Sequence, residues 1–510
     1  GSTKGRGWIY GTSFVDGVVP ILSPKAHKLA RYMLKIFNKD TIYNALDSLQ
    51  PSHETWDDLI NVLVQLRLQN EWGPIITICE WILEKSRFRP DVMCYNLLID
   101  AYGKTYQWKK AEGVYLRMIQ VFCVATADTY ALLVETYCIS GLFEKAEIVL
   151  HEMQKRGYPS RVTAYNTLIN AVAKAGNIHK AKEVYEKMKK EGCQPSVNTY
   201  TIMINVYGRA KLSDSAQEIF HEMKSAKCKP NICTYTALIN AYAKEANCEK
   251  AEEIFEQLQS AGHEPDVYAY NAIMEAYSQR GFPGGAAEIF SLMQHMGCEV
   301  DQASYNILID AYARAGLHDD VSRVFQDLKL TGFKPTIKSY VLVLSAYGKN
   351  GKVAESEQLL NQMQKIGLKP DTFVLNSMLN TYGRLGIYEK MEALLKTMEG
   401  GDSKPDISTY NILINVNAKA GFCDKVEELF ASLKTRNLKP DVVTWTSRIG
   451  AFAKKKQYHK CMKIFEQMLD AGCSPDARTT KVLLSACTNI DQSKELTSLI
   501  KRMGTADNLL

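Results

Sequence analysis

An internal repeat of 35 residues constrains this chain more than any other feature of its sequence. One residue, aromatic in all but one case, recurs at this interval without insertion or deletion. The series is Tyr95, Tyr130, Tyr165, Tyr200, Tyr235, Tyr270, Tyr305, Tyr340, Leu375, Tyr410 and Trp445. Setting it at position 4 of each unit gives eleven units over residues 92–476. Such strict phase predicts an array of one structural motif rather than several unrelated domains.

Each unit has the pattern of two helices. Apolar residues at positions 4, 8 and 11 form one stripe on a first helix. Glycine is frequent at position 15, as in Gly351 and Gly421, where it suits a left-handed residue after a helix. A second helix has a small residue at position 20, an aromatic residue or Leu at 24 and Met or Leu at 27, and proline near position 34 stops it. One hairpin cannot bury both stripes but stacked hairpins can, so we expect an all-α solenoid of helix-turn-helix units.

The flanking segments are expected to cap this stack. Residues 53–91 resemble a degenerate first repeat, with Trp56 in the aromatic slot, and residues 1–52 are expected to be N-terminal capping helices. Residues 477–510 are expected to be a C-terminal partial repeat or cap, with Thr480 in the aromatic slot. Pro24 to Asn38 and Asp40 to Leu49 are expected to be short amphipathic helices, and Ala477 to Met503 is expected to be a final hairpin. The N-terminal Gly1-Ser2 is typical of an expression scar, so we expect the natural start to lie outside this sequence.

Composition excludes two classes and leaves the partner open. With 46% hydrophobic residues the chain is not intrinsically disordered, and no apolar run approaches the roughly 18 residues of a membrane-spanning helix. A net charge of +6 permits a polyanionic partner without requiring one. The 13 cysteines contain no C-x-x-C motif, and several recur in phase with the repeat. We therefore expect reduced thiols, no bound metal and no cofactor.

The consensus of the unit resembles a known family. It begins V-x-x-Y-N, has A-x-x-x-F in its middle and ends G-x-x-P-D, most plainly in Val267–Asp301 and Ile407–Asp441. This is similar to the pentatricopeptide repeat family, in its P-type form with pure 35-residue units. The related tetratricopeptide family has a 34-residue period and a W-x-x-L-G-x-x-Y opening, which this chain lacks. The resemblance implies a right-handed superhelix that binds single-stranded RNA, reading about one base per repeat, without enzymatic activity.

The family's rule assigns base reading to positions 5 and 35 of each unit. The expected base-reading pairs are Asn96/Thr126, Asn166/Ser196, Thr201/Asn231, Thr236/Asp266, Asn271/Asp301, Asn306/Thr336, Asn376/Asp406, Asn411/Asp441 and Thr446/Asp476. Unit two departs from the pattern with Ala131 and Arg161; Pro159 stands one residue early there, so Ser160 is an alternative for the final position. Unit eight, with Val341 and Asp371, has no assignable base.

These polar residues have a second interpretation. Asp, Asn, Ser and Thr before a helix accept hydrogen bonds from free backbone N–H groups, each contributing about 1 kcal/mol. Repetition in phase favours base reading. The family's pairing preferences then give units three to eleven the sequence C, A, G, U, pyrimidine, any, U, U and G, from 5′ to 3′.

Position 13 is basic in nine of the eleven units. At 100° per residue it lies about 80° from position 5 on the first helix, so stacked units place a column of cations beside the readers. The expected phosphate-binding residues are Lys104, Lys174, Arg209, Lys244, Arg314, Lys349, Arg384, Lys419 and Lys454. The alternative is a favourable charge at a helix C-terminus. The small residue at position 12 has two interpretations as well, close approach of RNA or close helix packing.

We expect an RNA-binding protein of chloroplast or mitochondrion that covers a segment of an organellar transcript, in its stabilisation, processing, splicing or translation. We expect a monomer that has no membrane partner and that could meet proteins of RNA processing. The alternative is a protein-binding helical scaffold without RNA specificity.

Overall fold

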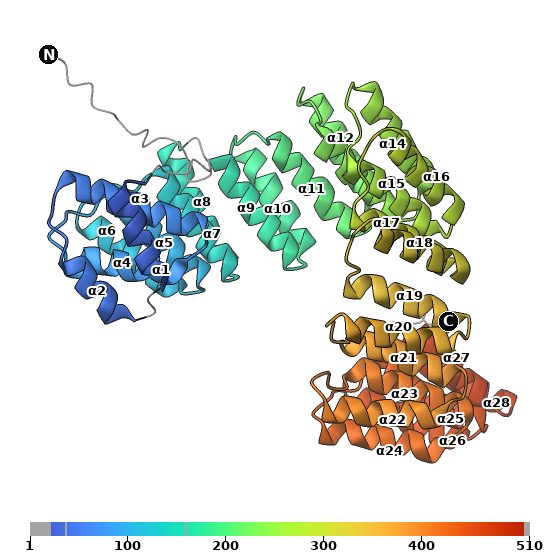
Figure 1. The fold of residues 1–510 in the computed structure, drawn as a ribbon. Helices are drawn as coiled ribbons and strands as arrows, with labels where there is room; N and C mark the ends of the chain where they lie inside the picture. Colours follow the sequence, from blue (N-terminus) through green and yellow to red (C-terminus); the bar gives the residue numbers. More distant parts are fainter. Residues whose placement is uncertain (1–21, 36–37, 159–160, 504–510) are drawn as a thin grey trace. The chain divides into compact units, whose positions relative to one another are not determined.

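The computed structural model describes residues 22–35, 38–158 and 161–503, and within these ranges it holds 28 helices and no strand (Figure 1). The chain divides into two compact parts, Gly1–Glu264 and Pro265–Leu510. The all-α repeat solenoid expected from the sequence is confirmed. Among the described helices none is long and apolar enough to cross a membrane.

Short helices precede the repeats. α1 (Pro24–Lys35) reaches the edge of the described residues, and α2 (Lys39–Asp47) ends two residues before the limit expected from the sequence, Leu49. α3 (His53–Leu68) and α4 (Trp72–Glu84) form the hairpin of the degenerate first repeat, where the ring centroids of Trp56 and Phe88 lie 5.6 Å apart.

Each repeat forms one helical hairpin. In the N-terminal part the hairpins are α5 (Val92–Lys104) with α6 (Trp108–Gln120), α7 (Ala127–Ile139) with α8 (Phe143–Arg156), α9 (Arg161–Lys174) with α10 (Ile178–Lys190), α11 (Val197–Arg209) with α12 (Ser213–Ser225), and α13 (Ile232–Lys244) with α14 (Cys248–Ser260). In the C-terminal part they are α15 (Val267–Arg280) with α16 (Pro283–His295), α17 (Gln302–Arg314) with α18 (His318–Leu330), α19 (Ile337–Lys349) with α20 (Val353–Lys365), α21 (Thr372–Arg384) with α22 (Tyr388–Gly400), α23 (Ile407–Ala420) with α24 (Cys423–Thr435), and α25 (Val442–Lys454) with α26 (Tyr458–Asp470). The final pair is α27 (Ala477–Ala486) and α28 (Ile490–Arg502), with Thr480 buried in the aromatic slot.

Within each part, the first helix of a unit packs on the first helix of the next, as from α5 to α7 and from α15 to α17. Most second helices pack against their own first helix and against the first helix that follows. Successive first helices therefore form one continuous layer, which places equivalent positions of neighbouring units side by side.

Aromatic contacts between units explain the strict 35-residue phase. The residue at position 24 packs against position 4 of the next unit, with ring centroids 5.4 Å apart for Phe325 and Tyr340 and 4.8 Å apart for Phe430 and Trp445. Such a pair contributes about 0.5–1.5 kcal/mol beyond its buried area. An insertion in either helix would break the contact with the neighbouring unit.

The small residue at position 12 is explained by helix packing. A Cβ added at Gly103 would lie 2.3 Å from Thr136 Oγ1, and one added at Gly348 would lie 2.2 Å from Thr381 Oγ1. Both threonines belong to the first helix of the next unit. Between the two interpretations of position 12, the structure favours packing over an approach of RNA.

Candidate nucleic-acid interface

In ten of the eleven units, position 35 lies immediately before the first helix of the next unit; in unit two, Arg161 lies within that helix. Asp406 Oδ1, for example, accepts a hydrogen bond of 2.8 Å from the backbone N–H of Thr409. The same cap is formed by Thr126, Ser196, Asn231, Asp266, Asp301, Thr336, Asp441 and Asp476. The capping interpretation is therefore correct for these residues. Any contact with a base must use polar atoms of these side chains that are not hydrogen-bonded in the cap.

The polar atoms that are not used in the cap differ with residue type. Asp406 and Asp476 use Oδ1 in the cap, so the second carboxylate oxygen is left as an acceptor. Asn231 also caps through Oδ1, accepting from Thr234 N at 3.0 Å, which leaves its Nδ2 amide as a donor. Ser196 caps through its hydroxyl oxygen, which also lies 3.2 Å from Thr199 Oγ1, so this hydroxyl can still donate or accept one hydrogen bond.

Position 5 lies in the second turn of the first helix and is mostly buried. Asn96, Asn271, Asn306 and Asn376 are between 3% and 9% exposed. Each Oδ1 accepts a hydrogen bond from a hydroxyl at position 3 of the next unit, at 2.7 Å for the pairs Asn96–Thr129, Asn271–Ser304, Asn306–Ser339 and Asn376–Thr409. Only a small part of the asparagine amide thus remains open to a ligand.

The structure brings positions 5 and 35 of a unit together. The amide of Asn271 donates to Asp301 at 3.2 Å, and that of Asn411 donates to Asp441 at 3.1 Å. In other units the two residues meet at one hydroxyl: Thr199 Oγ1 lies 2.7 Å from Asn166 Oδ1 and 3.2 Å from Ser196 Oγ. The same holds for Asn96/Thr126, Thr201/Asn231, Asn306/Thr336 and Thr446/Asp476. Thr236 and Asp266 lie in different parts of the chain.

Two carboxylates at position 35 carry a shifted pKa. Burial alone would raise the pKa of Asp406, but hydrogen bonds from Thr409 and Asn376 outweigh it and hold the pKa below its ordinary value. At Asp476, bonds from Thr479 likewise outweigh burial and lower the pKa. Both groups are therefore ionised at neutral pH and act as acceptors.

The cations of position 13 lie at the C-terminal ends of the first helices. Eight helix steps separate them from position 5, about 12 Å along the axis. All are exposed except Lys104, which is half-buried. Lys104 pairs with Glu135, and Arg314 pairs with Asp310 at 2.9 Å, so these two already have carboxylate partners.

The alternative interpretation, that these cations stabilise helix C-termini, also has support, and the helix concerned belongs to the preceding unit. Arg384 donates to the backbone carbonyl of Lys349 at 3.5 Å, and Lys454 donates to that of Lys419. Each cation thus caps the preceding unit's helix. Such bonds are exposed, and a phosphate could replace them.

One groove in the C-terminal part is lined by residues from positions 5, 35 and 13 together. It is lined by Thr446 and Asp476 of unit eleven, by the cations Lys419 and Lys454, and by Val443 at position 2. The side chain at position 2 is apolar and exposed in other units as well, 68% for Tyr268 and 74% for Phe373. A base could lie against such a side chain while its edge meets positions 5 and 35.

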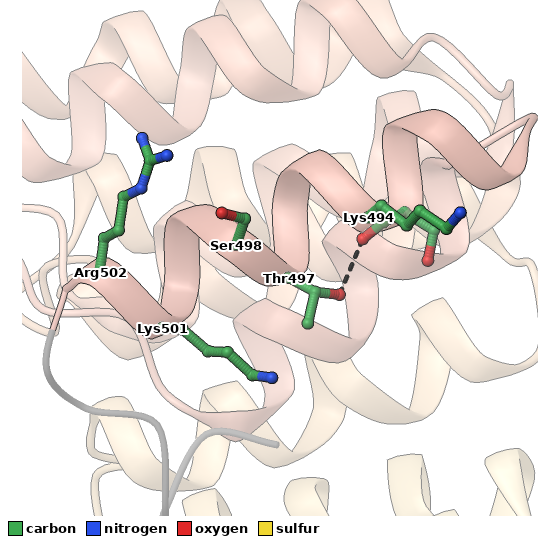
Figure 2. Close-up of a pocket in the computed structure, with 6 residues that line it drawn as sticks. Lys494, Thr497, Ser498, Lys501 and Arg502 are labelled. Carbon is green, nitrogen blue, oxygen red and sulfur yellow. Dashed lines mark hydrogen bonds between the residues drawn. The ribbon is translucent and has the colours of Figure 1, made fainter.

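Three features differ from the sequence analysis or were missed by it. Arg161 lies in α9 and is therefore not its cap, and Pro159 and Ser160 lie outside the described residues. The hydroxyl at position 3 was not singled out, although Ser or Thr recurs there in phase. On α28, exposed Lys494, Lys501 and Arg502 line a shallow pocket that contains no reader residue (Figure 2).

Family models for this type of repeat match most of the chain. The models described as "PPR repeat family" and "PPR repeat" match residues 370–489 and 338–368. Those described as "Pentatricopeptide repeat-containing protein" and "Pentacotripeptide-repeat region of PRORP" match residues 80–188 and 152–330. The chain belongs to the pentatricopeptide repeat family.

Known proteins resemble this pentatricopeptide repeat protein to different degrees. It is 55% identical over 131 residues to the Arabidopsis thaliana pentatricopeptide repeat-containing protein At2g35130, a match that spans 26% of this chain and 22% of that relative. The crystal structure of PPR10 from maize aligns over 96% of this chain and 80% of its own, with a TM-score of 0.56 and 22% identity, a likeness of fold. A structure of PPR10 in complex with an 18-nt psaJ RNA element aligns over 96% of this chain and 100% of its own, with a TM-score of 0.40 and 17% identity. Among the described residues, no group of three or more side chains is arranged to hold a metal ion.

Proposed function

We propose that this protein binds single-stranded RNA sequence-specifically, at about one base per repeat. The observation that carries the proposal is the convergence of positions 5 and 35 on one hydrogen-bonded node in unit after unit. Eight of the nine expected pairs form such a node. A protein-binding surface would not require one polar node at every 35-residue step.

The cap geometry accounts for half of the base preference. Guanine and uracil carry an imino N–H on the Watson–Crick edge, whereas adenine and cytosine carry a ring nitrogen that accepts. An aspartate whose first oxygen is used in the cap offers an acceptor, and so favours guanine or uracil. Asn231 and Ser196 offer a donor, and so favour adenine or cytosine. Position 5 then separates purine from pyrimidine by the family's rule, with Thr for the former and Asn for the latter.

The proposed target of units three to eleven is 5′-CAGUY-N-UUG-3′. Selection of the purified chain against a randomised single-stranded RNA pool at about 150 mM salt tests it directly. Enrichment of this motif supports the proposal. Failure to enrich any motif, with the protein folded, contradicts it.

A substitution in unit eleven gives a sharper test. In unit eleven the Thr479 hydroxyl lies between Thr446 and Asp476, with hydrogen bonds of 2.9 Å to each. Unit ten has Asn411, Thr444 and Asp441 in the same places. Thr446→Asn therefore gives unit eleven the residues of unit ten, and its preferred base should change from G to U. An unchanged preference at that step would show that Thr446 is not a reader.

The process in which the protein acts is part of the same proposal. By occupying one unpaired stretch of a chloroplast or mitochondrial transcript it would block nucleases or keep a processing, splicing or translation signal open, without catalysis of its own. The match to the repeat region of PRORP concerns residues 152–330 and so supports RNA binding rather than cleavage. Incubation with its enriched RNA should leave the RNA intact, and cleavage would contradict this.

A protein-binding scaffold remains the second candidate, supported by exposed apolar side chains such as Phe122, which is 93% exposed. Salt distinguishes the two. Six exposed cations, Lys174, Arg209, Lys349, Arg384, Lys419 and Lys454, predict a log–log slope of affinity against salt near −4 for single strands. A partner that binds with almost no salt dependence would favour the scaffold.

A further inference from the structure

We infer that the buried hydroxyl at position 3 of each following unit is a positioning residue for base reading, a third determinant that sets which face of the position 5 side chain a base meets. The inference rests on the proposed function. It concerns Thr129, Thr199, Thr234, Ser304, Ser339, Thr409, Thr444 and Thr479, all of them fully buried.

The hydroxyl fixes the orientation of the asparagine amide. In unit three, Thr199 Oγ1 accepts a hydrogen bond of 3.0 Å from the Ser196 backbone N–H, so its own proton is left to donate. It donates to Asn166 Oδ1 at 2.7 Å. An amide that presents its oxygen to this hydroxyl must present Nδ2, a donor, to a base. Without the hydroxyl the amide could turn over and present an acceptor instead.

The sequence pairs the two positions across units. Every asparagine at position 5 is followed by Ser or Thr at position 3 of the next unit. Where position 5 is apolar, position 3 is apolar too: Ala131 is followed by Ala164, and Val341 by Val374. Thr236, followed by Ala269, is the one exception. A hydroxyl needed only for its own cap would not follow the residue type of a different unit.

The contribution differs between units. In unit nine the carboxylate of Asp406 also holds the amide, accepting from Asn376 Nδ2 at 3.4 Å. In unit three, position 35 is Ser196, which has no carboxylate to attract Nδ2, so the hydroxyl of Thr199 alone selects the amide face. Loss of the hydroxyl should therefore relax reading more in unit three than in unit nine.

The first experiment removes the hydroxyl at constant shape. Thr199→Val should relax the preference for C over purines at the unit-three step by about tenfold, the effect of one net hydrogen bond, and Thr409→Val should relax the unit-nine step less. Thr199→Ser restores the hydroxyl and should restore the preference. A purely structural role would instead weaken binding to all RNAs alike, and that result would overturn the inference.

The second experiment builds the node where it is missing and does not depend on a destabilised variant. Unit eight has Asp371 at position 35 but Val341 and Val374 at the other two places. Val341→Asn alone should gain less than about threefold preference for U at that step, and Val341→Asn with Val374→Thr about tenfold. Equal gains by the single and double variants would overturn the inference. If wild type and reader variants show no base preference at any step, the proposed function itself fails.

Discussion

Replacing Asp406 by serine tests helix capping and base reading at one residue, because unit three of the same chain already has the residues that the variant would have in unit nine. Unit three has Asn, Ser and Thr at the three node positions, as Asn166, Ser196 and Thr199. Unit nine has Asn376, Asp406 and Thr409. Asp406→Ser therefore converts one natural node into another. The preferred base at that step should change from U to C.

The expected loss of stability follows from the cap distances. Asp406 Oδ1 accepts from the Thr409 N–H at 2.8 Å as a charged group, whereas Ser196 accepts from the Thr199 N–H at 3.4 Å as a neutral one. Hydrogen bonds to charged groups contribute about 1.5–3 kcal/mol and neutral ones about 0.5–1.5. The free energy of unfolding should therefore fall by about 1 kcal/mol. Asp406→Ala, which removes the cap entirely, should cost up to about 2 kcal/mol.

The expected change in specificity is larger than the change in stability. The carboxylate favours the uracil imino N–H, and the serine hydroxyl favours the cytosine ring nitrogen, each by about one hydrogen bond or tenfold. The ratio of the two affinities should thus change by about a hundredfold. Fluorescence anisotropy with 5′-CAGUCAUUG-3′ and its seventh-base C variant measures it. Equal weakening of both RNAs by the Ser and Ala variants would show that Asp406 is a cap and nothing more.

Three further predictions concern charge, packing and pH. Lys419→Ala should reduce the magnitude of the slope of log affinity against log salt by about 0.7 without changing the selected motif. Lys396→Ala, an exposed control on a second helix, should change neither. A changed motif would contradict a phosphate role for Lys419. Gly383→Ala should lower the free energy of unfolding by about 1–3 kcal/mol, because the new Cβ would lie 2.4 Å from Val416 Cγ2. The control Gly113→Ala places a Cβ with nothing within 4 Å and should raise the free energy of unfolding by about 0.5–1 kcal/mol. Equal effects in denaturant unfolding would refute the packing explanation of position 12. The pKa values of Asp406 and Asp476 are lowered in the folded protein, so ionisation of these carboxylates stabilises the fold above their ordinary pKa of 3.8, and this stability is lost as pH falls through the lower folded values. The Asp406→Ser variant should therefore lose less stability than wild type between about pH 5 and pH 2. Identical acid-unfolding curves would argue against an ionised cap.

Repetition made the fold predictable from the sequence. The apolar spacing of positions 4, 8 and 11, the glycine at position 15 and the proline near 34 each recur often enough to cancel local exceptions. Gly421 has a φ of 82°, as expected for the residue after a helix, yet Lys211 and Ala246 adopt the same conformation without glycine, with φ of 56° and 55°. Both turns are closed by backbone hydrogen bonds within the unit, from Lys211 N to Gly208 O at 3.1 Å and from Ala246 N to Ala243 O at 3.0 Å, so the turn forms without the glycine that predicts it.

The candidate site was predictable in its residues but not in its bonds. Positions 5 and 35 are 30 residues apart in sequence, and their direct contact, as between Asn411 and Asp441, depends on how one unit stacks on the next. The position 3 hydroxyl was missed because Ser or Thr after an N-cap has an ordinary explanation, the capping box. Its pairing with position 5 of the preceding unit was the signal that could have revealed it.

Capping and reading are therefore not alternatives at position 35, because they use different atoms of one side chain. A residue there must accept a hydrogen bond from the following helix and still offer a polar atom to a base. Asp, Asn, Ser and Thr satisfy both conditions, and every expected reader at position 35 is one of these four. Since the cap always uses an oxygen, Asp keeps a second oxygen as an acceptor, Asn keeps its amide as a donor, and the hydroxyl of Ser or Thr can still donate or accept. The helix that follows thus orients the reader, so the base preference of one unit depends on the unit after it.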